Sequence, residues 1–361
     1  MKPILAFSFI LIAATPAASQ TSAPAEFGQS LAELVERAEE LQPLETLIIA
    51  QGGEVLVEEG FRGHSTNEPT NIKSASKSVI SALVGIAIDK GILEGPDQKI
   101  APLLADKLPE NPDPRINDIT IGNLLSMQAG LGRTSGPNYG RWVASRDWVR
   151  AALAEPFDGE PGGGMLYSTG NTHLLSAILT RESGRSTLEL AKEWLEPLED
   201  FAIAGWMRDP QGIYFGGNQM AMTPKSMLAF GELYRNGGKT GSEQVISREW
   251  IETSWQPRTR SVFHDDQYGY GWFLADMEGH RVSYAWGYGG QMIYVVPSLE
   301  LTVVMTSAED QPSARNGHRD HLHRLMGDII SLMSAKTARS EAEERSPEEE
   351  EAAGGRSAAG N

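Results

Sequence analysis

The sequence contains no cysteine, and this absence removes several kinds of chemistry at once. Without thiols, the chain can form no disulfide, no thiolate metal site and no cysteine nucleophile, and it cannot be lipidated through an N-terminal cysteine. Basic residues are also few beside acidic ones, 31 against 48, which gives a formal net charge of −17. Because so acidic a surface repels nucleic-acid phosphates, DNA or RNA binding is not expected.

Long hydrophobic runs are missing as well, and the longest lies near the N-terminus. Lys2 precedes an apolar run from Ile4 to Ala14, and the small residues Ala17-Ala18-Ser19 follow it. This run covers roughly 16 Å at ~1.5 Å per residue, whereas a membrane-spanning helix needs roughly 20 residues. Residues 1–19 are therefore predicted to be a cleaved export signal rather than a membrane anchor. We expect a secreted or periplasmic protein with no integral membrane segment after signal cleavage.

The C-terminal end has the opposite character. Residues 336–361 contain seven Glu and four basic residues, with Ala, Ser and Gly making up most of the rest. A segment without an apolar stripe gains too little from burial to offset its ordering entropy. We therefore predict a disordered acidic tail over 336–361 and one folded domain over 20–335.

Within that domain, the periodicity of the sequence changes twice. Residues 45–59 form two β-rich runs joined by Gln51-Gly52-Gly53, which indicates a hairpin. Residues 74–90 have almost no polar face, which is typical of a helix buried on most sides. After Gln267 the period becomes two, as in consecutive antiparallel strands, and a last helix carries an apolar stripe from Leu322 to Met333. The segments between are mostly helical: Ile119–Met127, Trp142–Ala154, Asn171–Arg181 and Pro224–Asn236.

An isolated two-stranded hairpin is marginally stable in water, so the early strands are expected to join the late ones in a single sheet. This predicts an α+β fold. Its sheet region comes from about 20–95 plus 255–335, and a helical region of about 96–254 is inserted between the two halves.

One candidate for catalysis is the sequence Ser74-Ala75-Ser76-Lys77, at the start of the buried helix. The i, i+3 spacing places the Lys77 amine and the Ser74 hydroxyl on one face, one turn apart. Burial lowers the pKa of a lysine, which makes Lys77 a credible proton acceptor. The alternative is that Ser74 serves only as a helix N-cap.

Two further segments stand at junctions between elements. Pro161 to Thr169 is a glycine-rich loop that includes Tyr167 and leads into a helix. Trp286-Gly-Tyr-Gly-Gly-Gln291 ends one strand pattern and begins the next, and its glycines would let a ligand or another backbone come close. A packed aromatic and a tight turn are the simpler interpretations of these two segments.

Taken together, the three segments resemble the serine β-lactamase and penicillin-binding-protein superfamily. The resemblance is nearest to its class C β-lactamase-like branch, which includes family VIII esterases, 6-aminohexanoate-dimer hydrolases and DD-peptidases. It spans about residues 45–330, in family order, and is carried by NIKSASKSVISALVGIAIDKGIL, ITIGNLLSMQAGL, GGGMLYSTGNTHLLSAIL, GGNQMAMTPKSMLAFGELYRNGG and GYGGQMIYVVPSLELTVVMTS. The resemblance implies a β-lactamase/transpeptidase-like α+β fold.

The resemblance also assigns roles to individual residues. Ser74 matches the acylated nucleophile, Lys77 the lysine one turn on, and Tyr167 the tyrosine that shares proton transfer with it. The backbone N–H groups of Ser74 and Gln291 would form the oxyanion hole. The candidate substrate-binding residues are Thr169, Tyr288, Gly289 and Gly290, which stand at family motif positions, together with Trp286, which lies two residues before Tyr288.

Two of these positions depart from the family pattern. Thr169 stands where asparagine is typical, and Tyr288 stands where a cation or histidine is usual. With Trp286 expected on the same strand face as Tyr288, the sequence favours apolar ester or amide substrates. The prediction is a serine hydrolase without a cofactor, most simply an esterase. A β-lactamase or DD-peptidase, a sensor that is acylated but does not turn over, and a scaffold with a vestigial site remain alternatives.

Histidine is the other residue type that could carry chemistry. His318, His321 and His323 lie near Asp320 in sequence, but on a helix His321 and His323 lie on opposite edges of the apolar stripe and cannot converge, so no metal site is expected. His173 is expected to have a packing or surface role. The oligomeric state is left open.

Overall fold

The computed structural model describes residues 23–354. Residues 1–19, the predicted export signal, lie outside the described residues, so export stays a prediction. Among the described residues, no helix is both long and apolar enough to cross a membrane.

An eight-stranded antiparallel sheet joins the two ends of the domain. Its order is β2-β1-β13-β12-β11-β10-β9-β8, so the N-terminal hairpin pairs with the C-terminal strands through β1 and β13. This pairing confirms the predicted α+β fold with a sheet made from both halves of the chain. The strands are β1 Leu44–Gln51, β2 Glu54–Gly60, β8 Thr259–Arg260, β9 Gln267–Tyr268, β10 Phe273–Met277, β11 His280–Gly287, β12 Gln291–Val296 and β13 Leu301–Ser307.

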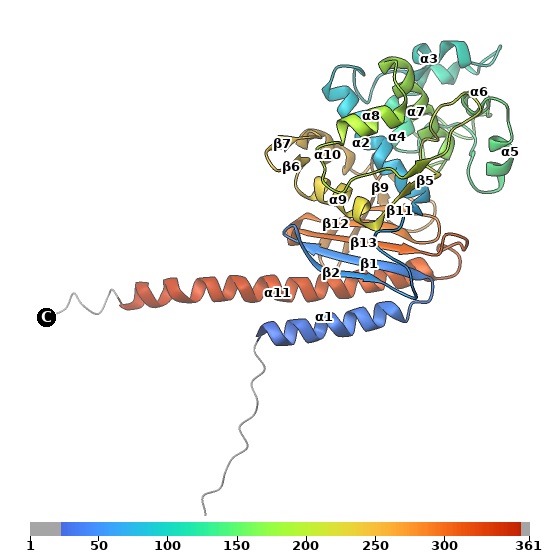
Figure 1. Cartoon of the computed structure of the whole chain (residues 1–361). Helices are drawn as coiled ribbons and strands as arrows, with labels where there is room; N and C mark the ends of the chain where they lie inside the picture. The colour runs from blue at the N-terminus through green and yellow to red at the C-terminus, as the bar shows by residue number, and fades with distance from the viewer. Residues whose placement is uncertain (1–22, 355–361) are drawn as a thin grey trace, which may run out of the picture.

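Both faces of this sheet are covered, which explains why β1 is apolar on both sides. Figure 1 shows helices α1 (Ala23–Glu39) and α11 (His318–Gly354) side by side along one face, and the helical region on the other. Helix α9 (Pro224–Arg235) packs directly on that other face, where a Cβ at Gly231 would come within 2.6 Å of Thr302. A strand buried on both faces reads as a continuous hydrophobic run.

Helix α11 extends past the point where the sequence predicted disorder. Instead of ending near residue 335, it continues to Gly354, and Lys336 Nζ donates to Gln51 Oε1 of β1 at 3.0 Å. Arg339 pairs with Glu26 of α1 at 3.3 Å. Because Ala, Glu, Lys and Arg are strong helix formers, the acidic segment prolongs a helix that begins on the sheet. Residues 355–361 lie outside the described part.

The helical region lies between β2 and β8 in sequence. The sequence predicted one helix over Trp142–Ala154, but the structure has two, because the Asp147 side chain caps a new helix by accepting from Arg150 N. The helices of this region are α2 Ser76–Asp89, α3 Ile100–Leu103, α4 Ile121–Leu125, α5 Tyr139–Val143, α6 Trp148–Leu153, α7 Thr169–Ser183, α8 Thr187–Trp194, α9 and α10 Arg248–Ser254. Short strands accompany them: β3 Thr70–Asn71, β4 Gly205–Trp206, β5 Met220–Met222, β6 Lys239–Thr240 and β7 Glu243–Gln244.

Helix α2 is the most enclosed of these helices, as the sequence predicted. Every residue from Ser76 to Ala87 is buried. The hydroxyls of Ser78 and Ser81 donate to the carbonyls of Gly271 and Tyr270, at 2.6 and 2.7 Å, so these buried polar groups are satisfied. Enclosure on all sides leaves little freedom for the position of the Ser74–Lys77 turn at its start.

Gly85 tests how tightly α2 is enclosed. A Cβ there would come within 2.3 Å of the Trp250 ring, so Gly85→Ala should lower the free energy of unfolding by about 1–3 kcal/mol through overpacking. A Cβ at Gly28, an exposed position of helix α1, would have no atom within 4 Å, so Gly28→Ala should instead be neutral or stabilise by up to ~1 kcal/mol. Urea unfolding of both variants measures the contrast. Equal free energies of unfolding for the two variants would show that the packing around α2 can accommodate an extra methyl group.

Candidate active site

Ser74 lies in a tight turn that the sequence placed inside the helix. A one-turn 3₁₀ helix, η1 (Lys73–Ala75), precedes α2, and Ser74 is half-buried within it. The turn is entered through Lys73, whose φ of 50° lies in the left-handed region and whose N–H donates to Asn71 Oδ1 at 3.0 Å. The Lys73 amine pairs with Glu309 at 2.6 Å. Ser74 makes no side-chain cap for either helix, so its hydroxyl is free for another role.

The Lys77 amine is brought to Ser74 as the i, i+3 spacing indicated. Its Nζ lies 3.1 Å from Ser74 Oγ, 3.3 Å from Thr169 Oγ1 and 2.7 Å from the carbonyl oxygen of Gly217. The side chain is only 1% exposed, and burial lowers the pKa of Lys77 to about 7. A substantial fraction of this lysine is therefore neutral near neutral pH.

The three partners of Lys77 determine which way its lone pair points. A neutral amine has two N–H donors and one lone pair, and the Gly217 carbonyl can only accept a hydrogen bond. The Thr169 hydroxyl can accept the second N–H. The lone pair is then left facing the Ser74 hydroxyl, which is the arrangement that proton abstraction requires.

Tyr167 completes the group around Ser74. It lies in the loop before α7 and is 7% exposed, with its ring against Phe263, Tyr268 and Phe273. Burial raises the pKa of Tyr167 to about 12, while its hydrogen bond with Ser74 acts in the opposite direction. The Tyr167 ring centroid is 5.2 Å from Lys77 Nζ. Around pH 7, the phenol is therefore protonated beside an amine of which a substantial fraction is neutral and can accept a proton.

Thr169, which stands where the family has asparagine, is buried at the first turn of α7. Its hydroxyl lies 3.0 Å from Ser135 Oγ as well as contacting Lys77, and its N–H donates to Ser135 Oγ at 2.8 Å. Thr169 thus touches the lysine directly. This contact adds a role to the substrate-binding one that the sequence suggested.

The segment 288–290 forms the turn between β11 and β12. Gly290 N donates to Gly287 O at 3.1 Å, and Gly289 and Gly290 have φ values of 92° and 115°, which favour glycine. A Cβ at Gly287 would lie 2.2 Å from the Ile72 carbonyl, so the end of β11 packs closely against the chain that leads into η1.

Gln291 begins β12, is fully buried, and is anchored by its amide to the Ser307 carbonyl at 2.5 Å. The described contacts join this hairpin to η1 through Gly287 and Ile72. The oxyanion hole made by the N–H groups of Ser74 and Gln291 stays a prediction.

The sequence predicted that Trp286 and Tyr288 share a strand face, but in the structure they do not. Strand β11 ends at Gly287, so Tyr288 stands in the turn, 48% exposed, while Trp286 is 9% exposed inside the strand. The Trp286 ring packs against Phe263, with ring centroids 5.8 Å apart, and beneath the Arg319 guanidinium. The turn separates the two side chains, because the two-residue alternation holds only while the strand continues.

Three contributors to the site were missed by sequence reasoning. Phe263 touches both Tyr167 and Trp286 and is 44% exposed, Gly217 supplies a carbonyl, and Ser135 supplies a hydroxyl. A main-chain carbonyl has no side-chain signature. Phe263 and Ser135 lie in loops without periodicity, so no local pattern marked them.

The C-terminal histidines serve separate contacts. His318 Nε2 lies 2.9 Å from Ser307 Oγ, whereas His323 packs edge-on against Tyr284. Among the side chains that the structure describes, no group of three or more His, Asp or Glu is placed to hold a metal ion.

Comparison with known proteins places these observations in a family. The chain matches the Beta-lactamase family over residues 31–327. It is 25% identical over 316 residues to the 6-aminohexanoate-dimer hydrolase of Paenarthrobacter ureafaciens, which covers 80% of this chain and 78% of that protein.

Two solved structures share the fold. EstCE1, a hydrolase with promiscuous acyltransferase activity, aligns with a TM-score of 0.67 and 17% identity over 85% of this chain and 99% of its own. A D-stereospecific amidohydrolase from Streptomyces sp. aligns with a TM-score of 0.61 and 15% identity over 81% and 98%. Because the family match spans most of the sequence, and the resemblance drawn from the sequence agrees with it, the chain belongs to the Beta-lactamase family.

Proposed function

We propose that this protein is an exported serine hydrolase that cleaves ester or amide bonds through an acyl-enzyme on Ser74. One observation carries the proposal: the half-buried Ser74 hydroxyl lies 3.1 Å from the amine of a fully buried lysine. A buried amine with a pKa lowered to about 7 can accept the serine proton near neutral pH, where an ordinary lysine would remain charged. Export rests on residues 1–19 alone.

In the proposed reaction, Lys77 accepts a proton and Tyr167 donates one. Neutral Lys77 takes the Ser74 proton as the serine oxygen bonds to the substrate carbonyl carbon. The negative charge that forms on the carbonyl oxygen is held by the N–H groups of Ser74 and Gln291. Tyr167, whose pKa is raised to about 12, donates its proton to the departing alcohol or amine and regains one from Lys77. Water then cleaves the acyl-serine with the same groups acting in reverse.

The surroundings of Ser74 favour apolar substrates. Val262, Phe263 and Tyr288 are among the few exposed large hydrophobic residues in the described chain, at 50%, 44% and 48%. The nearby cation of Lys73 is paired with Glu309, and Arg141 is paired with Glu155. Arg133, which donates from Nε to the Tyr167 carbonyl at 3.3 Å, makes no ion pair among the described residues and is the cation left near the site. Exposed apolar groups near a site nevertheless indicate an apolar ligand. An ester with a short apolar acyl group fits these surroundings best.

Cleavage of amides is the second candidate, because the name of the Paenarthrobacter relative describes a hydrolase of an amide dimer. A β-lactamase or DD-peptidase would need a carboxylate anchor. A sensor would share the same nucleophile but would keep the acyl group instead of releasing it, and a vestigial scaffold would not turn over at all.

Ser74→Ala should abolish turnover while the protein stays folded. Removing the nucleophile of a covalent mechanism costs on the order of a millionfold in kcat. Ser81→Ala, on the helix α2 that follows the turn of Ser74, removes only the hydrogen bond to Tyr270 and should keep wild-type kcat. Assays with p-nitrophenyl butyrate measure both variants, and a tenth of wild-type activity in Ser74→Ala would rule out the mechanism. Steady turnover after the initial burst in wild type separates an enzyme from a sensor.

The pH dependence of kcat/KM should follow the deprotonation of Lys77. Burial lowers its pKa to about 7, so the neutral, active amine accumulates as pH rises through 7 and is lost below it. We expect kcat/KM to fall about tenfold per pH unit below the midpoint and to level off above pH 8. Because Lys77 and Tyr167 are coupled, the midpoint belongs to the pair. Lys77→Arg should be nearly inactive at every pH, since guanidinium does not deprotonate; an active Lys77→Arg variant would remove lysine from the mechanism.

Substrate preference should follow the neutral Tyr288. A charge-assisted hydrogen bond to a substrate carboxylate is worth roughly 1.5–3 kcal/mol. Its absence should leave kcat/KM for p-nitrophenyl butyrate at least about tenfold above that for nitrocefin or a D-Ala-D-Ala peptide. Tyr288→Lys should narrow this gap, whereas Tyr288→Phe should not. Efficient nitrocefin or peptide cleavage by wild type, with weak esterase activity, would show that another cation binds the carboxylate.

A further inference from the structure

His173, on α7, is completely buried in an aromatic box. Its ring lies 5.8 Å from the ring of Trp142, 5.5 Å from that of Trp148 and 5.7 Å from that of Phe215. The sequence indicated only a packing or surface role. A fully buried imidazole must, however, satisfy both ring nitrogens, and their partners connect it to the rest of the molecule.

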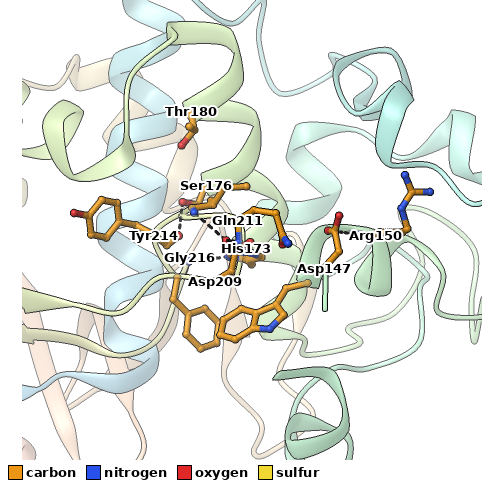
Figure 2. A network of polar contacts seen from close by, with 12 residues as sticks. Asp147, Arg150, His173, Ser176, Thr180, Asp209, Gln211, Tyr214 and Gly216 are labelled. Atoms are coloured by element: carbon orange, nitrogen blue, oxygen red, sulfur yellow. Dashed lines mark hydrogen bonds and ion pairs between the residues drawn. The ribbon is translucent and has the colours of Figure 1, made fainter. Parts of the chain in front are cut away.

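Both nitrogens of His173 are used (Figure 2). Nε2 lies 3.1 Å from Asp209 Oδ2, and Nδ1 accepts from Gly216 N–H at 3.3 Å. Because a backbone N–H can only donate, Nδ1 carries no proton, so the imidazole is neutral and donates from Nε2 to the carboxylate. Asp209 Oδ1 also accepts from the N–H groups of Gln211 and Ile213, at 2.8 and 2.9 Å. The loop after Asp209 is thus folded around one buried carboxylate.

The other end of this loop reaches the lysine. The one hydroxyl proton of Thr172 is shared between two carbonyl oxygens, those of Thr169 at 3.0 Å and Gly216 at 3.1 Å. The next carbonyl, that of Gly217, accepts from Lys77 Nζ at 2.7 Å. The two glycines are pressed between α7 and Lys77. A Cβ at Gly216 would lie 2.1 Å from the Thr172 carbonyl, and one at Gly217 would lie 2.7 Å from Lys77 Cγ.

We propose that His173, Asp209 and Thr172 are positioning residues that hold the Gly217 carbonyl against the Lys77 amine and so direct its lone pair toward Ser74. His173 binds the N–H of Gly216 and Thr172 binds its carbonyl, so the peptide units before and after Gly216 are both held, and the chain enters the Gly217 carbonyl from a fixed position. None of the three touches Ser74 in the described contacts. They act through the backbone, and this role rests on the proposed function of Lys77.

The helix offers a matched control for this role. Ser176, one turn beyond Thr172 on α7, is equally buried and donates to the Tyr214 carbonyl at 2.6 Å (Figure 2). It ties the same helix to the same loop, but not at Gly216 or Gly217. Loss of the Ser176 hydroxyl should therefore cost stability without moving the lysine.

The test compares Thr172→Val, Thr172→Ser, His173→Phe and Ser176→Ala in the full chain. One readout is the pH dependence of Ser74 labelling by a fluorophosphonate, expressed per folded molecule. A displaced base should slow labelling by roughly 10–100-fold in Thr172→Val and His173→Phe, whereas Thr172→Ser and Ser176→Ala should label like wild type.

A second readout does not depend on activity. In protein labelled with ¹³C-lysine, the Lys77 signal is the one that Lys77→Arg removes, and its titration midpoint reports the surroundings of the amine. The groups facing that amine are the hydroxyls of Ser74 and Thr169, the Gly217 carbonyl and the Tyr167 ring, so a shifted midpoint reflects a change among them. We expect the midpoint to move in Thr172→Val and His173→Phe and to stay in Ser176→Ala.

Two results would overturn the proposal: wild-type labelling and an unmoved Lys77 midpoint in folded Thr172→Val, or equal losses in Thr172→Val and Ser176→Ala. If His173→Phe fails to fold, the comparison of Thr172→Val with Thr172→Ser still tests the proposal. If wild type is neither labelled nor active, the proposed function fails. The NMR titration of Lys77 still shows whether Thr172 and His173 position its amine.

Discussion

The structure around the candidate site depends on the burial of one amine. Removing the Lys77 ammonium from water is costly unless polar partners surround it, and they come from three separate segments. Ser74 belongs to the turn before α2, Thr169 to α7, and the Gly217 carbonyl to the loop before β5. The packing that excludes water lowers the pKa of the lysine, and the partners that remain decide where its lone pair points. The same packing around Lys77 therefore sets both the pKa of its amine and the direction of its lone pair.

The sheet makes this meeting of segments possible. The helical region is inserted between the two halves of the sheet, and β1 pairs with β13 across it. That pairing brings the C-terminal hairpin back to the chain before Ser74, where Gly287 lies against the Ile72 carbonyl without room for a side chain. Helix α9 closes on the same face through Gly231. Small residues at these crossings let backbones approach where longer side chains would hold them apart.

The site also lies where two hydrophobic clusters meet. Val79 and Ile80 of α2 belong to the core of the helical region, while Tyr167 belongs to the cluster that includes the aromatic residues of the sheet. The lysine is thus enclosed from one side and the tyrosine from the other, and Ser74 remains half-exposed between them. Placement at this boundary gives two ionisable groups shifted pKa values in opposite senses, because burial disfavours the charged form of each.

The sequence by itself determined much of the fold and the centre of the candidate site. Local periodicity identified the β1–β2 hairpin, the buried helix and the late strands, and the spacing of Ser74 and Lys77 placed them on one face, because each of these patterns depends on near neighbours. The tertiary structure alone decided the rest. Lys77 meets Gly217 across 140 residues and Thr169 across 92, and His173 meets Asp209 across 36. The tertiary structure also decided that α11 continues to Gly354, and that β11 ends before Tyr288, so Tyr288 is not on the strand face that carries Trp286. These contacts join backbone groups and loops, which have no period in sequence, so only the folded chain could bring them together.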